Sequence, residues 1–159
     1  MEENLMYNGD DFDNDSMELE VELAMIFEDE VHQAASETID EMNDGKTYDI
    51  IEEQIIKGLT NVKSIDNIII AYEPVWAIGT GLTATVEKIN EMHSFIRKIL
   101  SRLYTNNDSD IIPILYGGSV NSDNANELIS IDGVNGFLIG GVSLDVIKFT
   151  DVVKIVNEQ

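Results

Sequence analysis

Three short apolar runs, each followed by a glycine-containing turn, constrain this chain more than any other feature of its sequence. The runs occupy residues 68–72, 111–116 and 136–139 and are rich in isoleucine and leucine. Continuous apolar runs of this kind are typical of parallel strands that are buried on both faces. Pro113 lies inside the second run, so we expect that strand to begin as late as Pro113, because proline cannot donate to a sheet ladder.

Segments with apolar residues at helical spacing alternate with these runs. Thr85 is a suitable N-cap for the longest of them, and an asparagine-rich turn is expected at residues 106–109. The alternation predicts an α/β fold with a parallel sheet and right-handed crossover connections. The expected helices span residues 48–59, 85–104, 123–129 and 144–157.

Acidic residues are concentrated at the amino end of the chain. The chain has 159 residues and a formal net charge of −22, and residues 1–44 hold 16 of its 31 acids but no lysine or arginine. Such a charge excludes a nucleic-acid phosphate binder and a protein that docks on anionic membranes. The change in composition near Gly45 predicts three parts: an acidic disordered tail (1–16), an acidic amphipathic helix (17–44) and an α/β domain (45–159).

The predicted acidic helix rests on apolar residues that recur at helical spacing from residue 17 to residue 42. Ser16 is a suitable N-cap, and Gly45 can end the helix in a left-handed conformation. A second interpretation starts from the acids at 11, 13, 15 and 22, which match the spacing of a calcium-binding loop. Ser16 stands where that loop needs glycine, so a plain acidic run is favoured.

Several classes of protein are excluded by what the sequence lacks. The chain has no cysteine, so it can form neither a disulfide framework nor a thiolate zinc site. No apolar run approaches the roughly 18 residues of a membrane span. The amino terminus carries acids where a signal peptide carries positive charge. We therefore expect a soluble, cytoplasmic protein without a metal site.

Glycine pairs follow the second and third predicted strands. Gly117-Gly118-Ser119 and Gly140-Gly141 stand at the carboxyl ends of strands, where sites form in parallel α/β proteins. Glycine lets backbone N–H groups approach an anion, and a following helix N-terminus adds a favourable dipole. Together the pairs suggest one phosphate site, to which Ser119 can add a hydroxyl donor. Each pair on its own is more often a tight turn between strand and helix.

Glu73, at the end of the first predicted strand, is a candidate general base. A carboxylate held beside a carbon acid, with water excluded, can have a pKa suited to proton abstraction. Residues 74–76 are stiff, whereas residues 77–81 are small, which is typical of a lid with a rigid hinge. The competing interpretation is a solvated glutamate at a strand end, and the lid that follows directly argues against it.

The three strand ends carry a family resemblance. Residues 71–81 (AYEPVWAIGTG) resemble the signature of triosephosphate isomerases, and residues 116–120 and 136–144 resemble the next two loops of that family in the same order. The resemblance covers the chain from about residue 37 to its end. It implies the last three parallel βα units of a TIM (β/α) barrel, which has eight strands when complete. It also implies a glycolytic isomerase, without a cofactor, that interconverts glyceraldehyde 3-phosphate and dihydroxyacetone phosphate.

The resemblance assigns roles to individual residues. Glu73 would be the catalytic base, and residues 74–84 would form the lid. Leu82 stands where the family usually has lysine and Val142 where it usually has alanine, but neither position is catalytic. The groups that would bind the substrate phosphate are the backbone N–H groups of Gly79, Ser119, Gly140 and Gly141.

The family's catalytic lysine and histidine belong to its first half, and no motif here matches them. Lys46 stands at a helix start, and His32 lies in the acidic segment as a solvated residue. His93 is expected to be either a surface residue or a packing residue of a helix. We therefore expect an incomplete, truncated isomerase that is weakly active or inactive alone. The alternatives are a split isomerase completed by another chain, a homo-oligomer, or a non-catalytic remnant whose acidic helix binds a basic partner.

Overall fold

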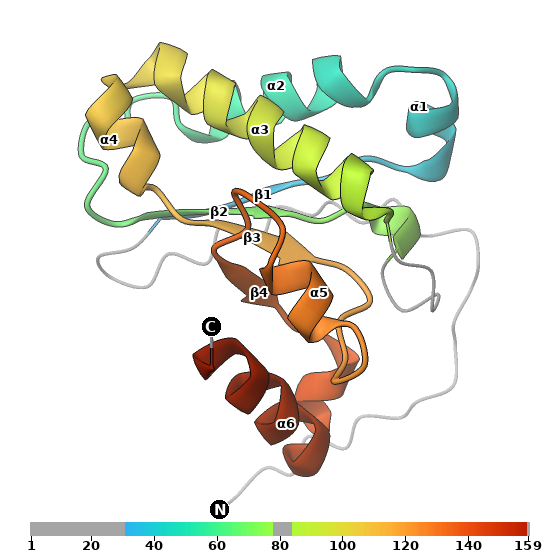
Figure 1. The fold of residues 1–159 in the computed structure, drawn as a ribbon. Helices are drawn as coiled ribbons and strands as arrows, with labels where there is room; N and C mark the ends of the chain where they lie inside the picture. Colours follow the sequence, from blue (N-terminus) through green and yellow to red (C-terminus); the bar gives the residue numbers. More distant parts are fainter. Residues whose placement is uncertain (1–30, 78–83, 159) are drawn as a thin grey trace, which may run out of the picture.

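Four parallel strands form one sheet in the order β1-β2-β3-β4 (Figure 1). The structure is a computed structural model that describes residues 31–77 and 84–158. Each strand lies next to the strand that follows it in the sequence, with helical segments between them. The strands are β1 (Val31–Ala35), β2 (Ile68–Tyr72), β3 (Ile114–Gly117) and β4 (Gly136–Leu138).

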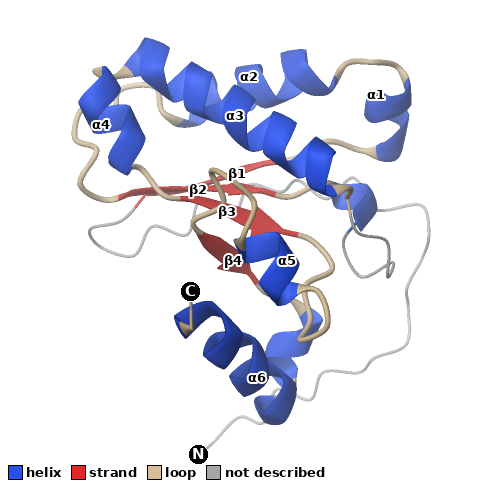
Figure 2. Cartoon of the chain, viewed as in Figure 1, coloured by secondary structure: helices blue, strands red, loops and turns tan. Residues whose placement is uncertain are grey.

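Helices pack beside the sheet and against one another (Figure 2). The helix α2 packs against β1 and α3, α3 packs against α4, and α5 packs against α6. Thr85 caps α3 as expected, because its side chain accepts a hydrogen bond from the Lys88 N–H. The helices are α1 (Ile39–Asn43), α2 (Thr47–Gly58), α3 (Val86–Leu103), α4 (Asn106–Ile111), α5 (Ala125–Ile129) and α6 (Val146–Asn157), with short 3₁₀ helices η1 (Val75–Ala77) and η2 (Gly141–Leu144).

The strand β1 corrects the prediction of one long acidic helix over residues 17–44. Residues Val31–Ala35 are paired in parallel with β2, from Val31 beside Ile68 to Ala35 beside Tyr72. Pairing along the whole strand outweighs a local helical pattern, because strand formation depends strongly on tertiary context. The sheet therefore has one more strand than the expected three. The expected disordered tail (1–16), the calcium-like spacing and the rest of the predicted helix up to residue 30 lie outside the described residues.

The end of the predicted acidic helix exists as the separate short helix α1. Thr38 caps it by accepting a hydrogen bond from the Glu41 N–H, and the Glu41 side chain accepts from the Thr38 N–H. Gly45 follows with a φ of +72°, so the left-handed conformation expected there is confirmed. The chain then enters α2 directly after Lys46, which confirms the helix-start position of that lysine.

The segment before β3 differs from its prediction. Residues Asn106–Ile111 form α4, where the sequence predicted a turn at residues 106–109 and, from residue 111, an apolar run whose strand begins as late as Pro113. Thr105 caps this helix through the Asp108 N–H, a local hydrogen bond that favours a helical start. The strand β3 begins at Ile114, directly after Pro113, and the Pro113 carbonyl accepts from the Ile70 N–H at 3.0 Å.

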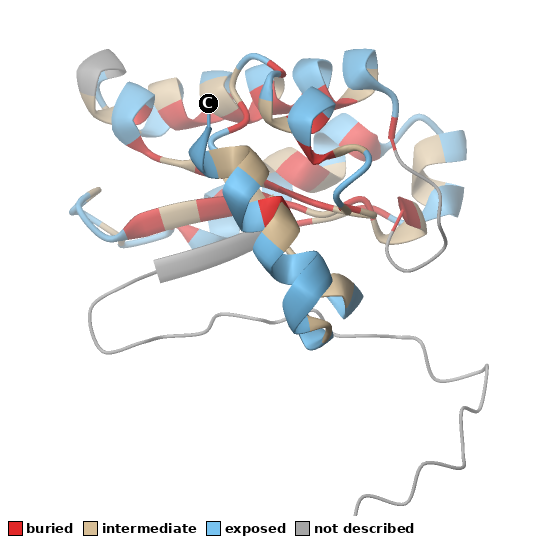
Figure 3. Ribbon diagram, turned by 60° about the horizontal axis from the view of Figure 1, so that its bottom comes forward, coloured by how far each residue is buried: buried red, intermediate tan, exposed pale blue. Residues whose placement is uncertain are grey.

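Burial is concentrated where the helices meet one face of the sheet (Figure 3). Ile68, Ile70 and Tyr72 alternate along β2 and are buried there. On the opposite face Ala71 is buried, whereas Ile69 and Leu115 are only partly buried, so the prediction of strands buried on both faces holds fully for one face and in part for the other. None of the helices in the described ranges is both long enough and apolar enough to span a membrane. The core residues of α2 and α3 are Ile51, Ile55, Ile89, Met92, Ile96, Ile99 and Leu100.

Candidate active site

The carboxyl ends of β2, β3 and β4 border one pocket of about 440 Å³. Glu73 follows β2, Ser119 follows β3, and Gly140 and Gly141 follow β4, so the structure brings these four predicted residues together. Gly79, the fifth predicted residue, lies outside the described residues. The pocket is lined by Glu73, Gly118, Ser119, Val120, Asn121, Leu138, Gly140, Gly141, Val142, Asp145 and Lys148.

Glu73 is held by its backbone and by the shape of the next strand. Its N–H donates to the Ala35 carbonyl of β1 at 2.8 Å, which continues the ladder beyond β2. Its half-buried side chain crosses Gly117, where an added Cβ would lie 2.3 Å from the Glu73 Cγ. Burial raises the pKa of the Glu73 carboxyl above its usual value. A carboxylate with a raised pKa is a stronger base than a solvated one, as a proton-abstracting group requires.

The glycines of the predicted phosphate turns differ in what surrounds them. Gly117 is required by the Glu73 side chain, and Gly118 by Tyr116, whose hydroxyl would lie 2.4 Å from an added Cβ. An added Cβ at Gly140 or Gly141 would meet no atom within 4 Å. The packing of the chain therefore explains the first pair, whereas the second pair leaves open space beside its backbone.

Ser119 connects the β3 turn to the hinge that follows Glu73. Its hydroxyl donates to the Ala77 carbonyl at 2.8 Å, and its own carbonyl accepts from the Asn124 side chain at 2.8 Å. Tyr116 makes a second connection, because its hydroxyl accepts from the Ala84 N–H at 3.4 Å. Ala77 and Ala84 both belong to the segment expected to form the lid, residues 74–84, so that segment is tied to β3 and its turn at two points.

A buried carboxyl that sequence reasoning missed lies beneath the hinge. Glu37 is 1% exposed, and its Oε1 accepts from the Tyr72 hydroxyl at 2.9 Å and from the Trp76 Nε1–H at 3.3 Å. Its backbone carbonyl accepts from the Val75 N–H at 3.1 Å. Its Oε2 is buried and has no hydrogen-bond partner among the residues that the structure describes. Burial raises the pKa of this carboxyl, and the two donors on Oε1 oppose that shift.

Neither of the two histidines in the described residues lines the pocket. His93 is buried in α3, where its Nδ1 is 3.0 Å from the Gly133 carbonyl. Burial lowers the pKa of His93 to about 4, so the ring is neutral near pH 7. Of the two roles expected for His93, surface or packing, the structure shows packing. His32 belongs to the strand β1, whereas the sequence had suggested that it lies in a helix.

Comparison with known proteins identifies the family. The profile of the family "Triosephosphate isomerase" matches residues 15–156. The chain belongs to the triosephosphate isomerase family. The match begins within the acidic segment, well before residue 37, where the resemblance was expected to start. The strand β1 accounts for part of the difference, because it places residues 31–35 in the parallel sheet.

Relatives with this name match over part of their length. The chain is 48% identical over 120 residues to the triosephosphate isomerase of Borreliella burgdorferi, a match that covers 74% of this chain and 47% of that protein. It is 42% identical over 141 residues to the triosephosphate isomerase of Chlorobaculum tepidum, covering 89% and 58%. The chain thus spans about half the length of the curated relatives it matches.

A solved structure supports the same fold. The crystal structure of triosephosphate isomerase from Bartonella henselae superposes with a TM-score of 0.72 at 36% sequence identity, covering 80% of this chain and 51% of that one. The described βα units therefore form a partial triosephosphate isomerase barrel, which confirms the fold class expected from the sequence.

Proposed function

We propose that this chain supplies the catalytic base and the phosphate-binding turns of a triosephosphate isomerase. The observation that carries the proposal is the shared pocket, which collects Glu73, Ser119, Gly140 and Gly141 from the ends of three neighbouring strands. The reaction interconverts glyceraldehyde 3-phosphate and dihydroxyacetone phosphate, a step of glycolysis that takes place in the cytoplasm.

Glu73 performs the proton transfer in this proposal. Its carboxylate removes a proton from the carbon beside the substrate carbonyl, which leaves an enediolate. The hydroxyl proton moves to the other enediolate oxygen, and Glu73 returns its proton to the former carbonyl carbon. The raised pKa of the half-buried carboxyl suits it to this task. The substrate phosphate lies against the open backbone at Gly140 and Gly141, where no atom of residues 31–77 or 84–158 would lie within 4 Å of an added Cβ.

The chain alone is expected to be a poor catalyst. An enediolate needs a positive charge and a hydrogen-bond donor at the developing oxyanion, and such groups supply orders of magnitude in rate. Lys148 is the one lysine or arginine of the described residues that lines the pocket, where it lies with Gly140, Gly141 and Asp145. It does not correspond to the catalytic lysine of the family, which belongs to the family's first half. His93 is buried against the Gly133 carbonyl.

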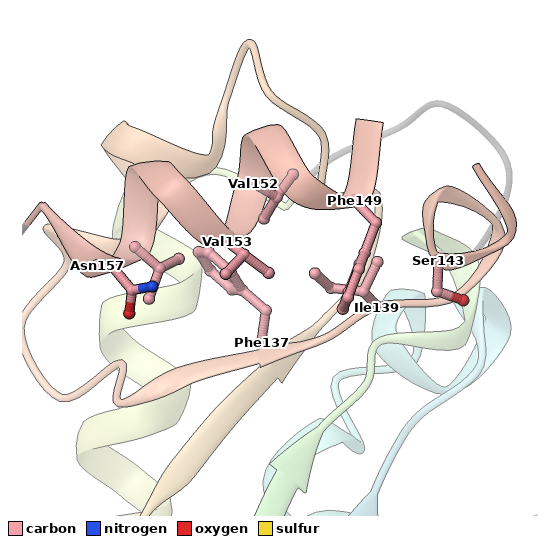
Figure 4. Close-up of a pocket in the computed structure, with 8 residues that line it drawn as sticks. Phe137, Ile139, Ser143, Phe149, Val152, Val153 and Asn157 are labelled. Carbon is pink, nitrogen blue, oxygen red and sulfur yellow. The ribbon is translucent and has the colours of Figure 1, made fainter. Parts of the chain in front are cut away.

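A second candidate is an isomerase completed by another polypeptide, either a second copy or a separate first half. This candidate is supported by an apolar surface formed by β4 and α6. A groove of about 400 Å³ runs between β4 and α6, where Phe149 lies beside Ile139 (Figure 4). Phe149 and Val153, which line this groove, are exposed. Further exposed apolar side chains of the segment from β4 to α6 are Leu138, Leu144, Val146 and Ile147.

One assay tests both candidates. Turnover of glyceraldehyde 3-phosphate is measured with the purified chain alone, and again after adding the first half of the Borreliella burgdorferi relative as a separate polypeptide. We expect little turnover alone and a large gain on addition. Glu73→Gln should then lower the restored rate by about 10²-fold or more, as loss of a general base does.

The outcomes separate the candidates. Restored turnover that the Glu73→Gln variant retains would refute the role of Glu73. Full turnover by the chain alone would show that completion is unnecessary. Failure of both samples, with the added half shown to bind, would favour a non-catalytic remnant.

A further inference from the structure

The pocket offers a substrate phosphate more negatively charged side chains than positively charged ones. Glu73, Asp145 and Lys148 are the charged residues that line it. Hydrogen bonds from the Lys148 and Ile147 N–H groups lower the pKa of Asp145, so its carboxylate is ionised near pH 7. A phosphate dianion would thus meet two carboxyl groups and one ammonium group.

The fold places Lys148 next to the open glycine turn. Gly140 and Gly141 lead into η2, and Asp145 then caps α6, whose first turn contains Lys148. The Lys148 Nζ lies 3.5 Å from the Asp145 Oδ2, and the two side chains are 67% and 45% exposed. An exposed pair of this kind holds its partners weakly, so the ammonium can exchange one anion for another.

We propose that Lys148 is a phosphate-binding side chain of this site, which leaves Asp145 and contacts the substrate phosphate held at Gly140 and Gly141. The inference rests on the proposed function, because it assigns a further residue to the same anion site. Lysine suits this role, since its ammonium is a compact charge on a flexible stem. The backbone N–H groups then orient the phosphate, and Lys148 offsets the carboxylates of Glu73 and Asp145.

The same helix contains a matched control. Lys154 pairs with Asp151 at 3.7 Å, with the same sequence spacing as Lys148 and Asp145, and its side chain is also 67% exposed. Lys154 does not line the pocket. Replacing either lysine therefore removes one exposed charge from α6, and the two variants differ in their position relative to the glycine turn.

The experiment is a titration of the full chain with inorganic phosphate, followed through the backbone amide signals of Ser119, Gly140 and Gly141 by NMR. Lys148→Gln should weaken binding by about fivefold, the effect of losing one charge contact in a solvated site. Lys154→Gln should change it by less than about twofold. Asp145→Asn keeps an N-cap side chain and should strengthen binding, because it releases Lys148.

Two results would overturn the inference. Equal weakening by Lys148→Gln and Lys154→Gln would show that only the general field of the helix matters, and the proposed function would stand. If phosphate leaves the Gly140 and Gly141 amides of the unaltered chain unchanged, both the inference and the proposed phosphate site fail. A gain in affinity with Asp145→Asn that Lys148→Gln abolishes in the double variant would support direct binding by Lys148.

Discussion

At the scale of single residues, Gly117 and Glu73 depend on each other. The sequence predicted that both stand at strand ends, because their motifs follow apolar runs. It could not predict their contact, which depends on how two neighbouring strands are aligned. The contact changes the interpretation of Gly117: its missing Cβ leaves room for the base, whereas the sequence suggested room for an anion.

Gly117→Ala should therefore destabilise the chain and displace the Glu73 side chain. We expect a loss of about 1–3 kcal/mol in the free energy of unfolding, as is typical of overpacking. Gly141→Ala is the control for stability, because its added Cβ meets no atom within 4 Å, and it should change that free energy by less than about 0.5 kcal/mol. Urea unfolding measures both, and equal losses would contradict the contact.

Glu37 marks a limit of sequence reasoning at this scale. It is one of 16 acids in residues 1–44, and no local pattern distinguishes a buried acid from its exposed neighbours. Its burial depends on Tyr72 and Trp76, two donors that are distant in sequence. Only the parallel alignment of β1 with β2 brings the three together.

Glu37→Gln should reduce the loss of stability at rising pH. Because the folded-state pKa of Glu37 is raised, its contribution is fully present below the unfolded value of about 4.5 and is lost as pH rises through the folded value. Glutamine keeps the acceptor oxygen for Tyr72 and Trp76 but cannot ionise. Unfolding of both proteins, measured from about pH 4.5 to pH 8, should show a growing advantage for the variant.

The control for that series is Glu87→Gln, which removes one exposed acid from the first turn of α3. If this variant gains as much stability with rising pH as Glu37→Gln does, the effect belongs to the net charge of the chain and not to the buried carboxyl.

At the scale of elements, prediction succeeded where several local signals agreed. The strand β2 and the helix α3 combine strong periodicity with a cap or an apolar run, and both lie where they were expected. The strand β1 offered only a short sequence with two polar residues, within an acidic segment whose apolar residues recur at helical spacing. Its strand state comes from pairing with β2, which no local signal contains.

The helices also differ in how firmly they are attached. Six residues of α3 are buried, whereas Val152 is the buried residue of α6. Local stability follows buried apolar contacts, so amides of α6 should exchange with solvent by local opening, and those of α3 mainly by global unfolding. Hydrogen exchange of the intact chain measures this. Equal protection of the two helices would mean that α6 is covered by a surface beyond the described contacts.

At the scale of the whole molecule, the family fold could be predicted from three motifs in the right order. The number of strands could not be predicted, because β1 lies in an acidic segment whose local pattern favours a helix. The net charge of −22 also acts on the molecule as a whole, since like charges in a compact chain repel one another.

Added salt should therefore stabilise the chain. Between about 10 mM and about 0.3 M NaCl the Debye length falls from roughly 30 Å to less than 10 Å, so repulsion between distant acids is screened. We expect Tm to rise by several degrees in a thermal melt. KCl should give the same rise, because screening does not depend on the identity of the ion. A Tm that falls with both salts would refute net self-repulsion.

The sequential order of the strands determines how this sheet can form. Each strand pairs with the next one along the chain, across an intervening helical segment and not a tight turn. No hairpin can start the sheet, so every pairing must first close a long loop, which slows folding. None of the four described strands is inserted between two strands that precede it in the sequence. The units can therefore dock in the order of their synthesis. The growing sheet then always presents its newest strand to the next one that leaves the ribosome.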